Sequence, residues 1–183
     1  MTQDMDVLVL LHKYCQDNEP LEQLLVRHSS DVAERALMIA RQHPEWDIDL
    51  TFLREAAMLH DIGCTRVNAP SIHCHGTEPY ICHGILGAEL LRREGLPQHA
   101  RVAERHTGTG LTASEIVRQG LPLPPQDFTP QTLEEQLNSY ADLFYSKSRP
   151  DAAKTPEQAM HSLEKFGADG VKVFRQWKER FEP

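Results

Sequence analysis

The sequence lacks any apolar run near the roughly 20 residues that a bilayer-spanning helix needs. Its longest apolar run near the N-terminus, residues 7–11, follows acidic residues and has neither a basic segment nor a cleavage site. Basic residues are also few: 19 Lys and Arg against 27 Asp and Glu give a net charge of −8. This balance argues against binding extended nucleic acid through a broad basic face. It leaves a small anionic substrate open, because a bound metal supplies local positive charge.

Strand signals are nearly absent, since no period-2 alternation stands between turn residues. A chain of 183 residues predicts one compact domain over 1–183. Apolar residues recur at helical spacing almost throughout, so we predict an all-α bundle of six to eight helices. The helices expected cover about 4–17, 20–43, 47–63, 79–94, 97–107, a short piece after Thr112, a segment from 129–130 to about 145, and about 155–182.

Glycine and proline mark the expected helix ends. We expect Gly63 to end the third helix and Thr129–Pro130 to begin the segment before Asp142. Gly167 and Gly170 weaken the last helix, whose apolar stripe is Leu163, Phe166, Val173 or Phe174, Trp177 and Phe181.

Ten histidines are many for this length and point to metal or acid–base chemistry. His60 and Asp61 follow the apolar stripe of the third helix, and neighbours on a helix can reach one point beside its end. The other candidates stand within or at the end of predicted helices: His28, His83, His106 and Asp142. Each has a plain alternative: a hydrogen-bonded core histidine, a helix-end charge or a solvated acid. Gly84 and Gly87 beside His83 leave room for a ligand or for close helix packing.

The order His, His–Asp, His, His, Asp resembles that of the HD-domain metal-dependent phosphohydrolases of the HDIG type. The matching stretches are residues 26–33, 60–63 (His–Asp–Ile–Gly), 83–90, 105–108 and 140–142. The resemblance covers a motif core of about 26–145, and a C-terminal helix at about 155–182 follows it. Within the family, the chain is similar to a small uncharacterised subgroup. Cyclic-dinucleotide members resemble His–Asp–Ile–Gly–Lys here, whereas Cys64 stands at the Lys position and no Gly–Tyr–Pro follows.

The resemblance implies a ligand set and a reaction. His28, His60, Asp61 and Asp142 would hold a first metal, and His83 and His106 a second, with Asp61 bridging. This nitrogen and oxygen mixture suits one or two divalent or trivalent ions of Fe, Mn, Co, Ni or Zn. Asp61 would also orient the attacking water and is the catalytic candidate.

The function expected is hydrolysis of a phosphate ester or anhydride of a nucleotide or another small phosphorylated metabolite. Arg66 and Lys147, each five residues after a ligand Asp, are the candidate substrate-phosphate contacts. The alternatives are a catalytically silent metal- or nucleotide-binding sensor and a helical interaction module. The sequence does not fix the oligomeric state.

The cysteines have no role in that resemblance. Without a recognisable signal we expect reduced thiols in a cytoplasmic protein that does not bind membranes. Cys64, His73, Cys74 and His75 lie in the loop 64–78, and Cys82 follows it. They form a four-ligand zinc site or a loop over the active site that happens to hold thiols and imidazoles, or one of the histidines contributes a proton donor to the active centre.

Overall fold

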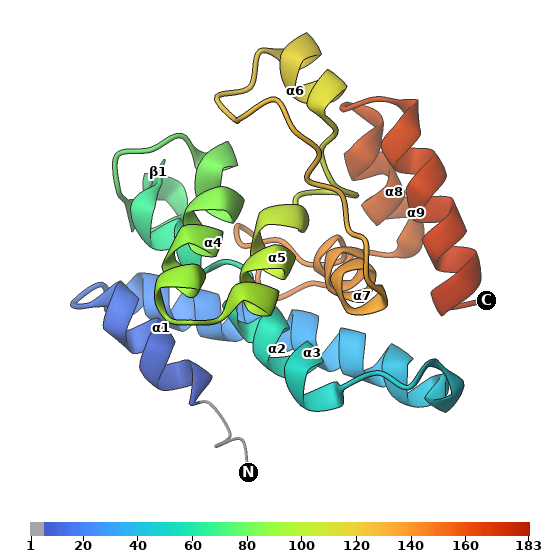
Figure 1. The fold of residues 1–183 in the computed structure, drawn as a ribbon, viewed down its shortest axis with the longest axis horizontal. Helices are drawn as coiled ribbons and strands as arrows, with labels where there is room; N and C mark the ends of the chain where they lie inside the picture. Colours follow the sequence, from blue (N-terminus) through green and yellow to red (C-terminus); the bar gives the residue numbers. More distant parts are fainter. Residues whose placement is uncertain (1–5) are drawn as a thin grey trace.

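The computed structural model describes residues 6–183, and within that range it is built almost wholly from α-helices (Figure 1). The α-helices are α1 (Val7–Cys15), α2 (Glu19–Gln42), α3 (Leu50–Leu59), α4 (His83–Arg93), α5 (Pro97–Arg105), α6 (Ala113–Gln119), α7 (Leu133–Asp142), α8 (Pro156–Glu164) and α9 (Ala168–Phe181). The all-α prediction is confirmed. The first predicted helix, about 4–17, begins partly outside the described residues.

The segment between α3 and α4 is compact irregular structure. It contains the 3-10 turns η2 (Ile62–Arg66), η3 (Pro70–Ile72) and η4 (Tyr80–Cys82), and a further turn, η1 (Pro44–Trp46), follows α2. Two short antiparallel strands, β1 (Asn68–Ala69) and β2 (Cys74–His75), pair Asn68 with His75 and Ala69 with Cys74. The loop predicted over 64–78 is therefore held by a small two-stranded ladder.

The helices begin and end where capping residues place them. Asn18 caps α2 and Asp49 caps α3 through side-chain oxygens that accept from backbone N–H groups. Thr132 and Glu135 form a capping box, so α7 begins at Leu133 rather than at the predicted Thr129–Pro130.

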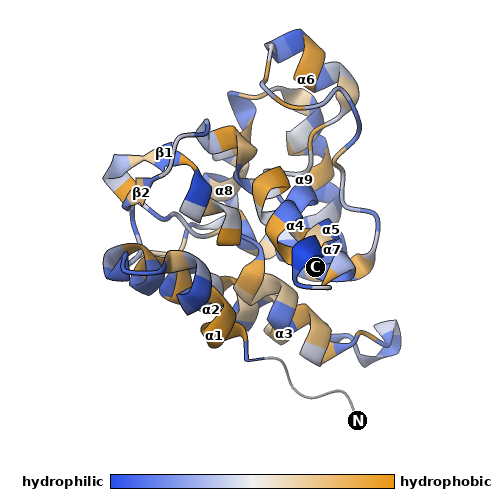
Figure 2. Cartoon of the chain, turned by 60° about the vertical axis from the view of Figure 1, so that its left-hand side comes forward, coloured by the Kyte–Doolittle hydropathy of each residue, from blue (hydrophilic) through white to orange (hydrophobic). Residues whose placement is uncertain are grey.

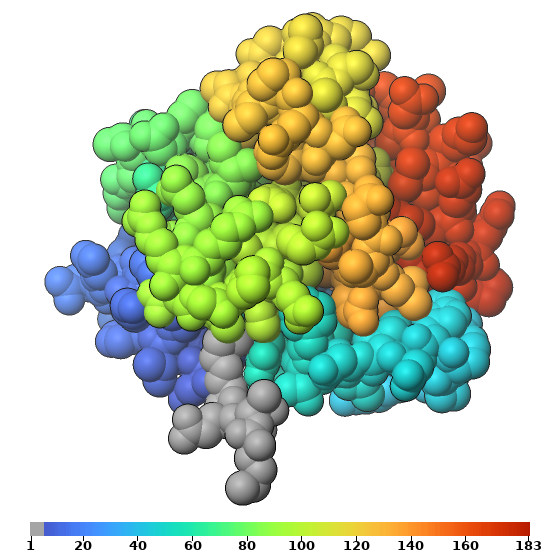
Figure 3. Space-filling view, viewed as in Figure 1, coloured from blue at the N-terminus to red at the C-terminus, as the bar shows by residue number. Residues whose placement is uncertain are grey.

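The helices form a bundle in which α2 and α3 lie beneath α4 and α5 in the view of Figure 1. Helix α7 lies between α5 and the C-terminal pair α8–α9, while α6 lies at the top. Figure 2 shows hydrophobic and hydrophilic bands alternating along the helices, the pattern of amphipathic helices. The space-filling view places α8 and α9 on the side of the molecule opposite α1 (Figure 3).

The C-terminal segment is two helices rather than the one predicted. Gly167 adopts a φ of +122°, which ends the helical path and separates α8 from α9. Leu163, Phe174, Trp177 and Phe181 are buried as predicted, but Phe166 is 58% exposed. The prediction for Phe166 is wrong because α8 ends at Glu164, before the helical spacing turns that ring inward.

Two predicted glycine roles are resolved by packing. Gly63 does not end α3; it lies within η2, where a Cβ would overlap the His83 carbonyl oxygen and the Gly87 amide nitrogen. A Cβ on Gly84 would lie 2.8 Å from the Ala103 carbonyl oxygen. Helix α4 therefore packs backbone to backbone against η2 on one side and α5 on the other. This close packing brings the segments that carry His60, His83 and His106 together.

Candidate metal centre

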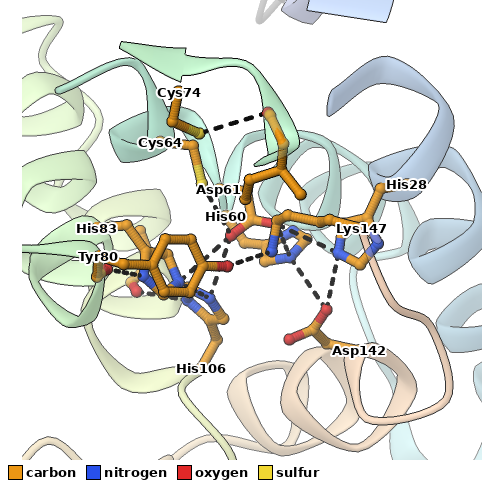
Figure 4. A network of polar contacts seen from close by, with 12 residues as sticks. His28, His60, Asp61, Cys64, Cys74, Tyr80, His83, His106, Asp142 and Lys147 are labelled. Carbon is orange, nitrogen blue, oxygen red and sulfur yellow. Dashed lines mark hydrogen bonds and ion pairs between the residues drawn. The ribbon is translucent and has the colours of Figure 1, made fainter. Parts of the chain in front are cut away.

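The six predicted ligands converge from five helices. His28 is in the buried stripe of α2, and His60 and Asp61 follow α3 directly. His83 is the first residue of α4, His106 follows α5, and Asp142 is the last residue of α7 (Figure 4). Because five of the six stand at helix ends, each short side chain can reach the central space without passing along a neighbouring helix.

The side chains form two groups that share Asp61. His28, His60, Asp61 and Asp142 offer ligand atoms that all lie within 4.8 Å of one another, and so do Asp61, His83 and His106. Asp61 Oδ2 lies 3.2 Å from His28 Nε2 and 3.1 Å from His60 Nε2, whereas Oδ1 lies 3.4 Å from Nε2 of both His83 and His106. The two oxygens of one carboxylate therefore face the two groups.

Backbone carbonyls fix three of the imidazole rings. Nδ1 of His60 donates to the Ala57 carbonyl oxygen at 2.6 Å, and Nδ1 of His106 donates to that of Ala103 at 2.6 Å. Nδ1 of His83 donates to the Tyr80 carbonyl oxygen at 2.7 Å. Because a carbonyl can only accept, each Nδ1 carries a proton and each ring turns Nε2 toward the centre, where it can bind a metal ion once the ring is neutral.

This arrangement fits a metal ion on grounds of chemistry as well as distance. Nε2 of His83 and Nε2 of His106 lie only 3.0 Å apart, so two acceptor atoms face each other when both rings are neutral. His60 Nε2 and Asp61 Oδ2 are buried without a partner in hydrogen-bonding geometry. Closely spaced buried acceptors and carboxylates are costly unless cations compensate them, and Lys147 Nζ, 2.7 Å from Asp61 Oδ2, supplies one such charge. Imidazole and carboxylate ligands suit a transition-metal ion, and the residues are positioned to hold one.

The electrostatics of the centre are set by burial and mutual charge. Burial opposes ionisation of Asp61, yet the positive charges of His60 and Lys147 hold its pKa well below the usual range. Burial lowers the pKa of His60, but Asp61 and Asp142 outweigh it and raise that pKa to about 10. Burial and the neighbouring His106 lower the pKa of His83 to about 3. The ligand group that contains His60 therefore favours positive charge, whereas His83 in the other group stays neutral.

Lys147 and Arg66, the two predicted phosphate contacts, are placed very differently. Lys147 Nζ lies 2.7 Å from Asp61 Oδ2, with only 10% of its side chain exposed. Arg66 pairs instead with Glu89 of α4 at 2.6 Å on a partly exposed face. The structure thus brings Lys147 into the centre and gives Arg66 a carboxylate partner elsewhere.

Sequence reasoning assigned no role at this centre to Tyr80, and it considered Cys64 only at the motif's Lys position and as a candidate zinc ligand. Tyr80 stacks on His83 with ring centroids 4.7 Å apart, and its hydroxyl accepts from Lys147 Nζ at 3.2 Å. Cys64 donates its thiol to Asp61 Oδ1 at 3.8 Å. Position 64 follows the His–Asp–Ile–Gly stretch by one residue, which was the available signal for Cys64. No pattern in the sequence distinguishes Tyr80.

The remaining histidines and cysteines of the loop do not form a metal group. The two ligand groups found within residues 6–183 contain neither His73, Cys74, His75 nor Cys82. Cys64 and Cys74 lie buried in a small apolar cluster that also contains Cys15, while His73 and His75 are exposed. Cys82 donates to the Pro122 carbonyl oxygen at 3.4 Å. The loop interpretation therefore describes this part of the chain better than the zinc-site interpretation.

Comparison with known proteins agrees with this geometry. The HD domain family model matches residues 25–147, a range that contains all six ligands and Lys147. The chain belongs to the HD domain family. An uncharacterised protein of Methanocaldococcus jannaschii is 37% identical over 138 residues, which is 74% of this chain and 70% of that protein.

Other relatives are longer, and a solved structure shares the fold. A tRNA (cytidine(56)-2'-O)-methyltransferase of Thermoplasma volcanium is 33% identical over 140 residues, covering 76% of this chain and 35% of that protein. The crystal structure of the HD domain of the L. monocytogenes phosphodiesterase PgpH superposes with a TM-score of 0.53 at 18% identity, covering 91% of this chain and 93% of that one. Its complex with cyclic-di-AMP superposes with the same TM-score at 17% identity, over 95% and 98% of the two chains. This HD domain chain contains no helix within residues 6–183 that is long and apolar enough to cross a membrane.

Proposed function

We propose that this protein is a metal-dependent phosphohydrolase that cleaves an ester or anhydride bond of a nucleotide or another small phosphorylated metabolite. The observation that supports it best is the sharing of Asp61 between two ligand groups with Lys147 beside them. Metal ligands alone would serve a structural site equally well. A buried ammonium next to the ligands adds a group that recognises an anion.

The residues divide into roles by position. His28, His60, Asp61 and Asp142 would hold one transition-metal ion, and Asp61, His83 and His106 a second. When bound, such an ion supplies a water molecule of lowered pKa as the nucleophile and offsets the charge of a phosphoryl group. Asp61 orients the attacking water through the carboxylate oxygens that face both groups. Lys147 binds a non-bridging phosphoryl oxygen.

Burial contributes to the chemistry. The side chains of His28, His60, Asp61, His83 and His106 are each at most 5% exposed, and Asp142 is 17% exposed. Electrostatic interactions are stronger in such a setting than in bulk water, so fixed charges stabilise a developing anion more effectively.

Metal analysis followed by a substrate screen tests the proposal. We expect about one or two transition-metal ions per chain and metal-dependent release of phosphate or a nucleotide from at least one compound. The panel should contain mono-, di- and cyclic nucleotides, sugar phosphates, and cyclic-di-AMP because the PgpH HD domain binds it. Asp61→Asn should lose metal and activity. Arg66→Gln breaks a surface ion pair with Glu89 and is the matched control for a substitution of Lys147.

Two results would redirect the proposal. Metal-loaded protein that binds a nucleotide without forming product would identify a sensor. Protein in which Asp61→Asn retains the wild-type metal content would reject the metal centre, and with it the phosphohydrolase. Circular dichroism of the same variant shows whether the helices are retained.

A further inference from the structure

Tyr80 stands over the metal centre without a role in holding it. Tyr80 is the first residue of η4, the turn that directly precedes the ligand His83. Its ring stacks on the His83 imidazole at an interplanar angle of 25° (Figure 4). The side chain is directed across the centre toward Lys147. Tyr80 is 37% exposed, although every ligand around it is buried or nearly so. It therefore forms part of the wall between the ligands and solvent.

The hydrogen bonds leave the phenolic proton available. The Tyr80 oxygen accepts from Lys147 Nζ, because an ammonium can only donate. The hydroxyl then has its own O–H left to donate, and the described chain, residues 6–183, places no acceptor in position for it. A polar O–H at a partly exposed site with its lone pair already engaged is ready to donate to an external acceptor.

The Lys147 ammonium has a similar surplus. It has three donor hydrogens, and the contacts that it makes within the described residues are with Asp61 Oδ2 at 2.7 Å and the Tyr80 hydroxyl at 3.2 Å. One hydrogen remains. Two adjacent groups, one hydroxyl and one ammonium, thus present unused donors at the same edge of the metal centre. A tetrahedral phosphoryl group offers several acceptor oxygens and matches two such donors.

We propose that Tyr80 is a substrate-binding residue whose hydroxyl, together with the Lys147 ammonium, donates hydrogen bonds to the oxygens of the phosphoryl group. This inference rests on the proposed function, and it adds a ligand of the substrate that the family resemblance did not supply. The substrate class that it indicates is a phosphate ester or anhydride with at least two free oxygens on the reacting phosphorus.

A structural role for Tyr80 makes a different prediction. The backbone carbonyl of Tyr80 already orients His83 through Nδ1, and that contact does not depend on the side chain. Tyr80→Phe retains both the carbonyl and the stacked ring and removes only the hydroxyl. Tyr80→Leu also removes the stacking on His83. The two variants therefore separate substrate binding from support of a metal ligand.

The experiment measures inorganic phosphate binding to manganese-loaded protein by calorimetry, with metal content determined on the same samples. We expect Tyr80→Phe to keep the wild-type metal content and to bind phosphate about 10-fold or more weakly, since a hydrogen bond to a charged acceptor is lost. In hydrolysis of a substrate found in the screen, KM should rise by a similar factor. Tyr14→Phe is the control, because Tyr14 donates to Glu94 beside Lys13 at the surface.

The outcomes separate this inference from the proposed function. Wild-type protein that binds phosphate and hydrolyses an ester, together with an unchanged phosphate affinity in Tyr80→Phe, overturns the role of Tyr80 alone. If Tyr80→Phe keeps the wild-type phosphate affinity and Tyr80→Leu loses metal, the inference is overturned, and the Tyr80 ring instead supports the metal ligand His83. Metal-loaded wild-type protein that binds no phosphate and hydrolyses nothing overturns both.

Discussion

Replacing Lys147 by Met should have opposite effects on metal and on phosphate. Met keeps the length and apolar stem of the side chain but removes its charge. In the metal-free protein the Lys147 ammonium is the nearest cation to Asp61, at 2.7 Å from Oδ2, and Asp61 is 1% exposed. The ammonium therefore stands in for part of the positive charge that a metal would bring. Its loss leaves a buried carboxylate short of compensation.

The size of the effect follows from that burial. Removing one partner of a buried ion pair costs about 3–5 kcal/mol. His28 and His60 stay within 3.2 Å of the same oxygen and take over part of the charge, so we expect a loss of about 2–3 kcal/mol in the metal-free protein. For a chain of this size that corresponds to a fall in Tm of roughly 5–10 °C.

The same loss should tighten metal binding. A bound metal compensates Asp61 whether or not Lys147 is charged, so the destabilisation largely disappears in the loaded protein. The thermodynamic cycle then makes metal affinity about 30- to 150-fold higher in Lys147→Met than in wild type. Phosphate affinity should fall, because the donor to the phosphoryl oxygen has gone.

Thermal unfolding with and without manganese, and calorimetric titration with the same ion, measure both quantities. Lys13→Met is the matched control: Lys13 pairs with Glu94 at 2.6 Å, a similar distance, but at the surface, so its Tm and metal affinity should barely change. If Lys147→Met binds metal more weakly than wild type, or gains no more Tm from manganese, the placement of this ammonium beside Asp61 is refuted.

Three further predictions concern stoichiometry, protons and packing. His83→Ala should reduce the metal bound by about one ion per chain while leaving the other group intact, whereas His28→Ala should disrupt the group without His83; metal analysis distinguishes them. Since Asp61 and Asp142 raise the pKa of His60 to about 10 but a ligand imidazole is neutral, metal binding near pH 7 should release a proton. Affinity should therefore rise with pH below about 10, which titrations in buffers of different ionisation enthalpy check. Gly63→Ala should destabilise the protein by about 3 kcal/mol in denaturant unfolding, while Gly170→Ala, which meets only a flexible hydroxyl at 3.2 Å, should cost little.

The ligand set was predictable from the family resemblance, and helical patterning marked the positions of several of its members. His28 interrupts an apolar stripe, and the structure buries it in α2. His60–Asp61 and Asp142 follow or end such stripes, and the structure places them at the ends of α3 and α7. Polar side chains at these positions must either leave the core or contact a polar or charged partner. Such positions can be recognised in the sequence because they interrupt or end an apolar stripe of helical period.

Contacts between distant segments could not be predicted in the same way. Arg66 and Lys147 both follow a ligand aspartate by five residues, so spacing alone treats them alike. The chain after Asp61 enters η2 and leaves Arg66 beside Glu89, whereas the chain after Asp142 turns back and brings Lys147 to Asp61. Tyr80 could not be predicted either, because only the tertiary fold shows that its ring lies beside the metal centre.

Backbone contacts set the relative positions of three ligand histidines. Gly63, Gly84 and Gly87 let η2, α4 and α5 approach so closely that the relative positions of His60, His83 and His106 are set by main-chain contacts. Each of these rings is then oriented by the carbonyl three residues before it. Main-chain contacts of this kind hold the ligand side chains close together, so their negative charge needs compensation. The Lys147 ammonium, 2.7 Å from Asp61 Oδ2, offsets part of that charge, and under the proposed function it would donate to a phosphoryl oxygen when substrate binds. Under that proposal the same side chain would link metal loading to phosphate binding.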